Sequence, residues 1–207
     1  MRNEVLHGYL IHHRKYRERS HIVHLFTQEH GRVDGILRQT PPPQYQPITV
    51  QASGKSELKN FSKLEILNQP IFFHGDAFFL CFYFFEIIFR FCPLEEAMVE
   101  TFAQYHQTLN QLQNMATQAD QNAFLRQILR QFEYALIEEL GYPLDYSQDS
   151  MQNQILSNQR YQFQLTDGFI PVSHTASTVL TGEQILCMQS YEKGMDFNLE
   201  QLQLLTK

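Results

Sequence analysis

Positively charged side chains are concentrated in one short segment near the N-terminus. Arg14, Lys15, Arg17 and Arg19 lie around a single acid, Glu18. Further cations of the same region are Arg32, Arg38, Lys55, Lys59 and Lys63. A single-stranded nucleic acid is bound by a positive groove that follows its phosphates. The clustering predicts such a groove, and a solvated charged surface without a ligand is the alternative.

Aromatic side chains are available in the same region. Tyr9, Tyr16, Tyr45 and Phe61 all fall among residues 1–70. Bases stack on aromatic faces with little regard to sequence. Cations together with aromatics therefore favour single-strand binding over a solvated surface without a ligand.

Histidines form the second set with chemical potential. Six of the nine fall within the first 30 residues: His7, His12, His13, His21, His24 and His30. Adjacent residues of a strand point to opposite faces, so His12 and His13 are not expected to hold one ion together. Exposed or core-edge histidines are therefore favoured over a metal site. No Gly-rich phosphate loop, G-x-S-x-G or H-E-x-x-H motif is present, and we expect no catalytic residue, metal or cofactor.

Two arginines further along the chain are candidates for binding a partner protein. Arg126 and Arg130 lie one turn apart on a predicted helix, where they are able to hold a carboxylate-bearing peptide. The alternative is pairing with nearby acids such as Glu133. Glu86 and Arg90 have the spacing of an intrahelical ion pair, which is favoured over catalysis there.

Charge divides the chain into two parts. Residues 1–70 contain ten Lys and Arg against six Asp and Glu, whereas residues 71–207 contain six against sixteen. A basic segment on an acidic remainder predicts two domains with different partners, although the total charge is −6. The three cysteines lack C-x-x-C spacing, which disfavours a disulfide framework or a cysteine zinc site and favours the cytoplasm.

Short runs of β-branched and aromatic residues punctuated by turns occupy the first 70 residues. They predict strands at about 5–13, 20–27, 32–38, 47–52 and 57–67, with a cationic turn at 14–19. Five short strands with a basic face match a small barrel of the oligonucleotide-binding (OB) type, though composition alone does not exclude an SH3-like barrel. We therefore expect an α+β protein with an OB-type domain at 1–70 and a helical domain at 71–207.

Apolar residues recur at helical spacing after residue 70. Three stripes predict three helices: Phe79 or Leu80, Tyr83, Ile87 and Phe91; Met98, Phe102, Tyr105, Leu109 and Leu112; Leu125, Ile128 or Leu129, Phe132, Leu136 and Leu140. The run at 77–85 is too short to span a bilayer, so we expect no membrane segment. Gly141 is placed for a left-handed helix cap.

Fewer signals mark the last third of the chain. Residues 160–172 predict a hairpin, the insert at about 159–172 in the helical domain. Thr181 with Gln184 predicts a capping box at the start of a helix, and Asn198 with Gln201 a weaker one.

Four motifs resemble those of the bacterial RecO family. They are IHHRKYRERSHIVHLFTQEHGR at 11–32, GKSELK at 54–59, FYFFE at 82–86 with Arg90, and LRQFEYAL at 129–136 followed by ELGY at 139–142. Their order and approximate spacing hold from residue 6 to about 190. The resemblance therefore covers most of the chain.

This resemblance implies a DNA-binding recombination mediator with an OB-type barrel and a helical domain. Such proteins bind single- and double-stranded DNA, anneal complementary strands and help load RecA onto strands covered by single-stranded DNA-binding protein. They act in the bacterial cytoplasm at the nucleoid, with RecR and, in some lineages, with the acidic C-terminal tail of the single-stranded DNA-binding protein. The family points to Arg130, together with Arg126, for the tail contact.

Several departures from the family pattern bear on these expectations. After Arg38 the chain has Gln39, Thr40 and three prolines where the family has a basic loop, which predicts weaker DNA binding there. Gln131 replaces a family arginine, which weakens the tail site. Residues 145–172 contain no cysteine, so no zinc is expected, and we expect the basic C-terminal helices of the family to be missing from this sequence. An adaptor that binds protein partners and has little DNA affinity is the competing hypothesis.

Overall fold

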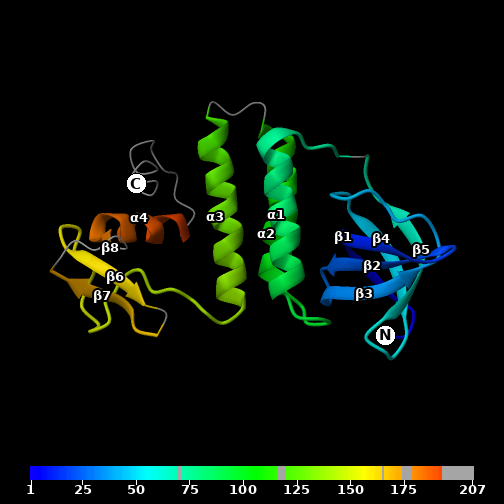
Figure 1. Ribbon diagram of the computed structural model, residues 1–207, viewed down its shortest axis with the longest axis horizontal. Coiled ribbons are helices and arrows are strands. Elements are labelled where there is room, and N and C mark those ends of the chain that lie inside the picture. The colour runs from blue at the N-terminus through cyan, green and yellow to red at the C-terminus, as the bar shows by residue number, and fades with distance from the viewer. Residues whose placement is uncertain (70, 116–119, 165, 174–178, 193–207) are drawn as a thin grey trace. The chain divides into compact units, whose positions relative to one another are not determined.

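The computed structural model describes residues 1–69, 71–115, 120–164, 166–173 and 179–192. Its contacts divide the chain into two compact units, Met1–Ala119 and Asp120–Lys207. Among the described residues, the first unit contains the barrel and two helices, and the second contains two helices and a small sheet (Figure 1). Within the described residues, no helix combines the length and apolar character needed to cross a membrane.

The five N-terminal strands form a closed barrel. The strands are β1 (Glu4–Arg17), β2 (Ser20–Thr27), β3 (Gly31–Leu37), β4 (Ile48–Ser53) and β5 (Lys59–Ile66). Their order around the barrel is β1-β2-β3-β5-β4, and only β3 and β5 pair in parallel. This architecture, followed by helices and a small hairpin, confirms the predicted α+β fold with an OB-type barrel.

Alternating apolar residues fill the barrel. Burial alternates strictly along β3 and β4, as expected for strands with one face in a core. The core is formed by Leu6, Leu10, Val23, Leu25, Val33, Leu37, Ile48, Val50, Ala52 and Phe61. A Cβ atom on Gly35 would lie 2.4 Å from the Phe61 ring, so the absent side chain allows β3 and β5 to close the barrel.

The predicted turn at 14–19 is wrong, because β1 continues through Arg17. Arg14 pairs with Ile22, Lys15 with His21 and Arg17 with Ser20, so only the tip at residues 18–19 turns. A bulge between Lys15 and Arg17 leaves Tyr16 as the extra residue. The charged side chains stay in water while the backbone pairs with β2, so charge and strand structure are compatible here.

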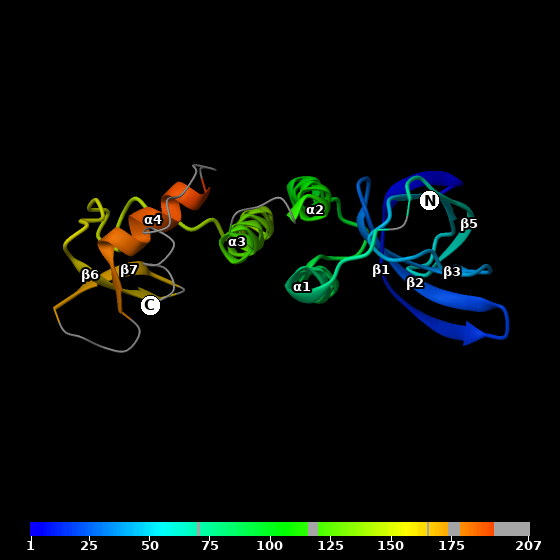
Figure 2. The ribbon, with the colours of Figure 1, turned by 90° about the horizontal axis from the view of Figure 1, so that it is seen from above.

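Two helices cover the outer face of β1 and β2. They are α1 (Gly75–Phe91) and α2 (Val99–Gln113), which lie beside the barrel in Figure 2. The ring centroids of Tyr9 and Tyr105 are 5.2 Å apart, and those of Phe26 and Phe102 are 5.4 Å apart. Met98, Tyr105, Leu109 and Leu112 are buried, which confirms the predicted stripe of α2.

The predicted stripe of α1 is wrong. Its buried residues are Ala77, Cys81, Phe84, Phe85 and Ile88, whereas Phe79, Tyr83 and Phe91 are exposed. The helix is apolar on nearly every side, so residue spacing does not identify the buried face. Tyr45 of the barrel does so by stacking on Phe85, with 4.9 Å between ring centroids. The predicted Glu86–Arg90 pair is confirmed at 2.6 Å.

The second unit begins with α3 (Gln121–Glu139), whose buried residues Leu125, Ile128, Phe132 and Leu136 confirm the third stripe. At its end Gly141 has φ +86°, and the amides of Gly141 and Tyr142 donate to the carbonyls of Glu138 and Ile137. This is a Schellman cap, in agreement with the predicted left-handed glycine.

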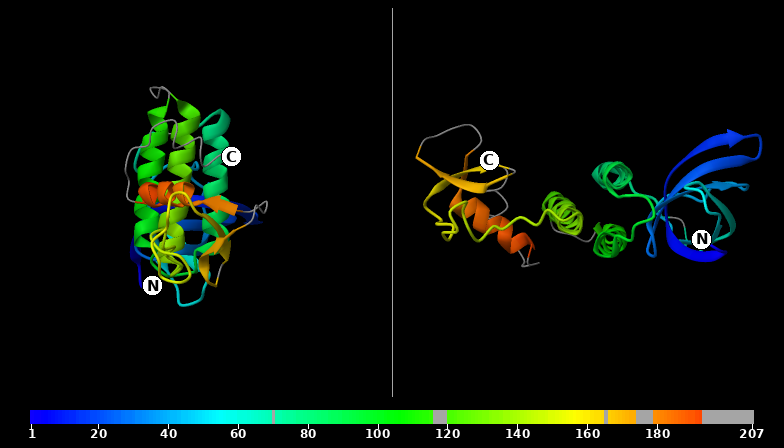
Figure 3. Two further views of the ribbon diagram at one scale, coloured as in Figure 1. Left: turned by 90° about the vertical axis from the view of Figure 1, so that its left-hand side faces the viewer. Right: turned by 90° about the horizontal axis from the view of Figure 1, so that it is seen from below.

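The small sheet of this unit contains the predicted hairpin and a third strand that the sequence did not reveal. Strands β6 (Arg160–Gln164) and β7 (Gly168–Val172) form the hairpin, and β8 (Val179–Thr181) pairs with β6. Thr181 and Gln184 exchange hydrogen bonds of 2.8 and 3.2 Å at the start of α4 (Gly182–Glu192), which confirms the capping box. Ile185 packs with Tyr161 and Phe169, so α4 lies beside the sheet (Figure 3). The box predicted at Asn198 and Gln201 lies outside the described residues.

Candidate nucleic-acid interface

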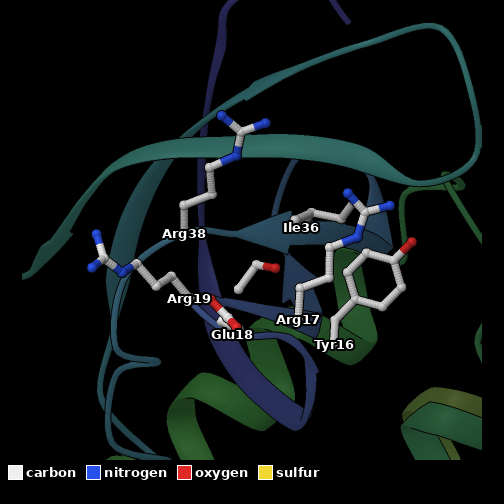
Figure 4. A pocket seen from close by; sticks show the side chains of 7 residues that line it. Tyr16, Arg17, Glu18, Arg19, Ile36 and Arg38 are labelled. Atoms are coloured by element: carbon white, nitrogen blue, oxygen red, sulfur yellow. The ribbon is translucent and has the colours of Figure 1, made fainter.

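A hollow of about 650 Å³ lies at the tip of the β1–β2 hairpin, beside the end of β3. Its lining consists of Tyr16, Arg17, Glu18, Arg19, Ser20, Ile36 and Arg38. Figure 4 shows Arg17, Arg19 and Arg38 arranged around it, with Tyr16 next to Arg17. Three of the arginines predicted from sequence are therefore brought together.

The strand register explains this convergence. Arg14, Ile22 and Ile36 are opposite one another across β1, β2 and β3, so they point to the same face. One row further out, Arg17 is opposite Ser20, and Arg38 follows the residue that pairs with His21. Residues far apart in sequence thus meet on the outer face of the barrel.

The hollow is electropositive. Glu18 is its single acidic lining residue, and within the described part of the chain no ion pair engages Arg17, Arg19 or Arg38. Adjacent guanidinium groups repel one another, and a phosphate placed between them relieves that repulsion through charge-assisted hydrogen bonds. The arrangement is suited to a polyanion.

Tyr16 is the aromatic residue of this site. Its side chain is 44% exposed, and the Arg17 guanidinium carbon lies 5.1 Å from its ring centroid. The prediction that Tyr9, Tyr45 and Phe61 are available for stacking is wrong, because all three are buried. Burial raises the pKa of both Tyr9 and Tyr45 to about 12.

The remaining predicted cations of the hairpin and of the β4–β5 loop are exposed but lie outside this hollow. Arg14 and Lys15 occupy successive positions on β1, so they point to opposite faces. Lys55 is in the loop at 54–58 between β4 and β5. These three residues can add to the positive field around the hairpin without lining the hollow.

Two other predicted cations are engaged inside the first unit. The Lys59 ammonium is buried and lies 2.5 Å from a carboxylate oxygen of Glu95 and 2.6 Å from the carbonyl of Ser56. The Arg32 guanidinium lies 5.1 Å from the Phe89 ring centroid and donates to the Phe89 carbonyl. These contacts join the barrel to the end of α1 and the segment that follows it, so neither side chain contributes to the hairpin hollow.

The histidines pair across strands. His12 lies 5.8 Å from His24, and His13 lies 5.9 Å from His21, measured between ring centroids. Desolvation, then the charges of His24, His13 and Arg14, lower the pKa of His12 and disfavour its protonated form. In the described residues no three His, Cys, Asp or Glu side chains are grouped to hold a metal ion.

A second hollow, of about 490 Å³, adjoins the first and was missed from the sequence. It is lined by Ile36, Arg38, Gln39, Ser53, Asn60, Phe61, Ser62 and Lys63. Ile36 and Asn60 meet through the parallel pairing of β3 and β5. Only the five-strand order of an OB-type barrel, with its β3–β5 contact, would have indicated this neighbourhood.

One of the two arginines of the predicted partner site on α3 forms an ion pair with an acid of the same helix. Arg126 and Arg130 are both exposed, one turn apart. Arg130 pairs with Glu133 on the same helix, which is the alternative that the sequence offered. The Arg130 side chain is 54% exposed and that of Glu133 is 18% exposed, so a carboxylate ligand would have to compete with Glu133 for the exposed side of this guanidinium.

Comparison with known proteins identifies the family. The model of the domain described as "Recombination protein O N terminal" matches residues 1–70. The chain is 34% identical over 182 residues to DNA repair protein RecO of Alteromonas mediterranea, covering 83% of this chain and 75% of that protein. The chain belongs to the RecO family. RecO of Pseudomonas putida is 31% identical over 187 residues, covering 87% of this chain and 79% of that protein.

Membership identifies a DNA repair protein and confirms the resemblance found in the motifs. The RecO N-terminal model covers the five strands of the barrel, whereas the compact unit that contains the barrel extends to Ala119. A domain boundary at residue 70, with a second domain at 71–207, stays a prediction.

Proposed function

We propose that this RecO-family chain is a DNA-binding recombination mediator without catalytic activity. It binds single- and double-stranded DNA, promotes annealing of complementary strands and helps load RecA onto strands covered by single-stranded DNA-binding protein. It acts in the cytoplasm at the nucleoid, with RecR and the acidic tail of the single-stranded DNA-binding protein as protein partners. The observation that carries DNA binding is the convergence of Arg17, Arg19 and Arg38 around the hairpin hollow.

The proposed nucleic-acid-binding set comprises eight of the cations predicted from the sequence, with different expected contributions. Arg17, Arg19 and Arg38 contact phosphates directly. Arg14, Lys15 and Lys55 supply the surrounding positive field. Arg32 and Lys59 act through the packing of the barrel, because their side chains are committed to Phe89 and Glu95.

A salt-titrated binding assay tests the proposal. Replacing Arg17, Arg19 and Arg38 together by Ala should weaken binding of a single-stranded oligonucleotide by about tenfold or more at about 50 mM salt. Each phosphate contact contributes about 0.7 to the slope of log affinity against log salt for a single strand. Losing three contacts should therefore make this slope about 2 shallower. The annealing rate of complementary strands should fall in parallel.

The matched control removes three exposed arginines that do not line the hollow. The variant Arg2→Ala/Arg90→Ala/Arg160→Ala changes the net charge equally and should retain the slope. Equal loss in both variants would show that total charge, rather than the hairpin hollow, governs binding.

The adaptor hypothesis is favoured by a different observation. Arg126 and Arg130 are exposed on α3, and the segment after Arg38 carries prolines in place of cations. On this hypothesis an acidic tail peptide binds to wild type in calorimetry, Arg126→Ala/Arg130→Ala abolishes that binding, and DNA binding is undetectable. Salt-sensitive DNA binding by the wild type decides for the mediator.

A further inference from the structure

The two hollows on the barrel share a wall. Ile36 and Arg38 line both of them, so Arg38 lies between the hairpin tip and the exposed end of the β3–β5 seam. A flexible ligand bound at the hairpin therefore has a second depression within reach. A strand that passes over Arg38 enters it directly.

The lining of the second hollow differs in chemistry from that of the first. It combines the amides of Gln39 and Asn60, the hydroxyls of Ser53 and Ser62 and the cations Arg38 and Lys63. None of these lining residues, all of which the structure describes, is acidic. Side-chain amides both donate and accept hydrogen bonds and pair with the edges of unpaired bases, whereas cations bind phosphates. Within the described residues the amides of Gln39 and Asn60 have no hydrogen-bond partner, so they are available to a ligand.

Lys63 reaches this hollow because of a bulge in β5. Gln51 pairs with Ser62 and Thr49 with Glu65, so two residues of β5 lie opposite one of β4. Strict alternation from the buried Phe61 would turn Lys63 into the barrel. The bulge instead lets Leu64 pack on the core and leaves Lys63 exposed, with φ +49°. A non-glycine residue in this left-handed region is strained, and such residues often hold ligands.

We infer that the second hollow is a subsite for unpaired nucleotides of the same strand that the hairpin binds. Lys63 and Arg38 hold phosphates, and Asn60 and Gln39 bind base edges. This inference rests on the proposed function, because it extends a strand already held at the hairpin. Base pairing occupies the edges that the amides would bind, so the subsite favours a single strand over a duplex.

Oligonucleotide length separates the two hollows. OB-type domains bind about 4 to 16 nucleotides, so an oligonucleotide of about 4 residues should occupy the hairpin hollow alone and one of about 12 should fill both. Lys63→Asn removes the charge while keeping a residue that tolerates the left-handed conformation, so the fold is preserved. Arg2→Asn removes one exposed charge that lines neither hollow and is the matched control.

For the longer oligonucleotide we expect Lys63→Asn to weaken binding by about threefold to tenfold and to reduce the salt slope by about 0.7, one phosphate contact. Binding of the short oligonucleotide and of a duplex should not change. Lys63→Arg should retain wild-type binding of the longer strand. Asn60→Ala should lower affinity for the longer strand without altering the slope, because its contact is uncharged.

The inference is overturned if Lys63→Asn and Arg2→Asn have the same effect on the longer strand, or if Lys63→Asn weakens short and long strands equally. Failure of the proposed function is a separate result, in which wild type binds neither length or the Arg17, Arg19 and Arg38 variant keeps full affinity. Thermal unfolding of each variant verifies that the fold is retained.

Discussion

Lys59 and Lys63 lie four residues apart on β5, yet their side chains have different surroundings. The Lys59 side chain is 3% exposed and contacts Glu95, which is 32% exposed and lies 36 residues further along the chain. Lys63 is exposed beside the second hollow. The difference arises from the bulge at Lys63 and Leu64 and from Glu95, which reaches Lys59 after α1 ends.

The Lys59–Glu95 pair gives a stability prediction. Glu95→Gln leaves a buried ammonium group without a counter-charge, and we expect it to lower the free energy of unfolding by about 2 kcal/mol. Lys59→Met replaces the ammonium with apolar volume and lets the partly exposed Glu95 hydrate, so it should cost less. Urea unfolding followed by circular dichroism measures both. Equal costs, or a larger cost for Lys59→Met, would contradict this account.

Local sequence was sufficient to predict part of the candidate site. Arg17 and Arg19 are close together because both lie at the tip of one hairpin. Arg38 joins them only through the pairing of β3 with β2, and Lys59 leaves the site because of Glu95. Counting cations in sequence cannot separate these outcomes, since each depends on a residue that the fold brings from elsewhere.

At the scale of elements, the buried face of a helix was predicted correctly where the helix has one apolar and one polar face. The stripes of α2 and α3 alternate with polar residues, and both were predicted correctly. In α1 the sequence GDAFFLCFYFFEIIFRF is apolar almost all round, so several faces fit helical spacing equally well. Hydrophobic periodicity identified the helix but could not choose its buried side.

The buried face of α1 gives the second prediction. Phe84 is fully buried, and its ring contacts Tyr105, whereas Phe79 is 69% exposed. Phe84→Ala should lower the free energy of unfolding by about 3 to 5 kcal/mol through the cavity it leaves. Phe79→Ala should change it by less than about 0.5 kcal/mol. Chemical unfolding of the two variants measures the difference, and comparable losses would contradict the assignment of Phe84 to the buried face and of Phe79 to the exposed face.

At the scale of the whole chain, charge and contacts divide the molecule at different places. The basic segment and the RecO N-terminal model both end at residue 70, whereas the first compact unit extends to Ala119. The barrel therefore matches the basic segment and the N-terminal family model, but residues outside residues 1–70 cover part of its outer face. Tyr9 and Phe26 on that face are covered by Phe102 and Tyr105 of α2.

Two fragments test which division describes a folding unit. The fragment 1–119 retains α1 and α2, and we expect it to unfold cooperatively, with the chemical-shift dispersion of a packed core. The fragment 1–70 would expose Tyr9, Phe26 and Tyr45 together, because residues of α1 and α2 cover them, and an apolar patch of that kind promotes aggregation or partial unfolding. Size-exclusion chromatography and two-dimensional NMR distinguish the fragments. A monomeric, cooperatively folded 1–70 fragment would instead support a domain boundary at residue 70, because the strands would then be stable without the helices that cover them.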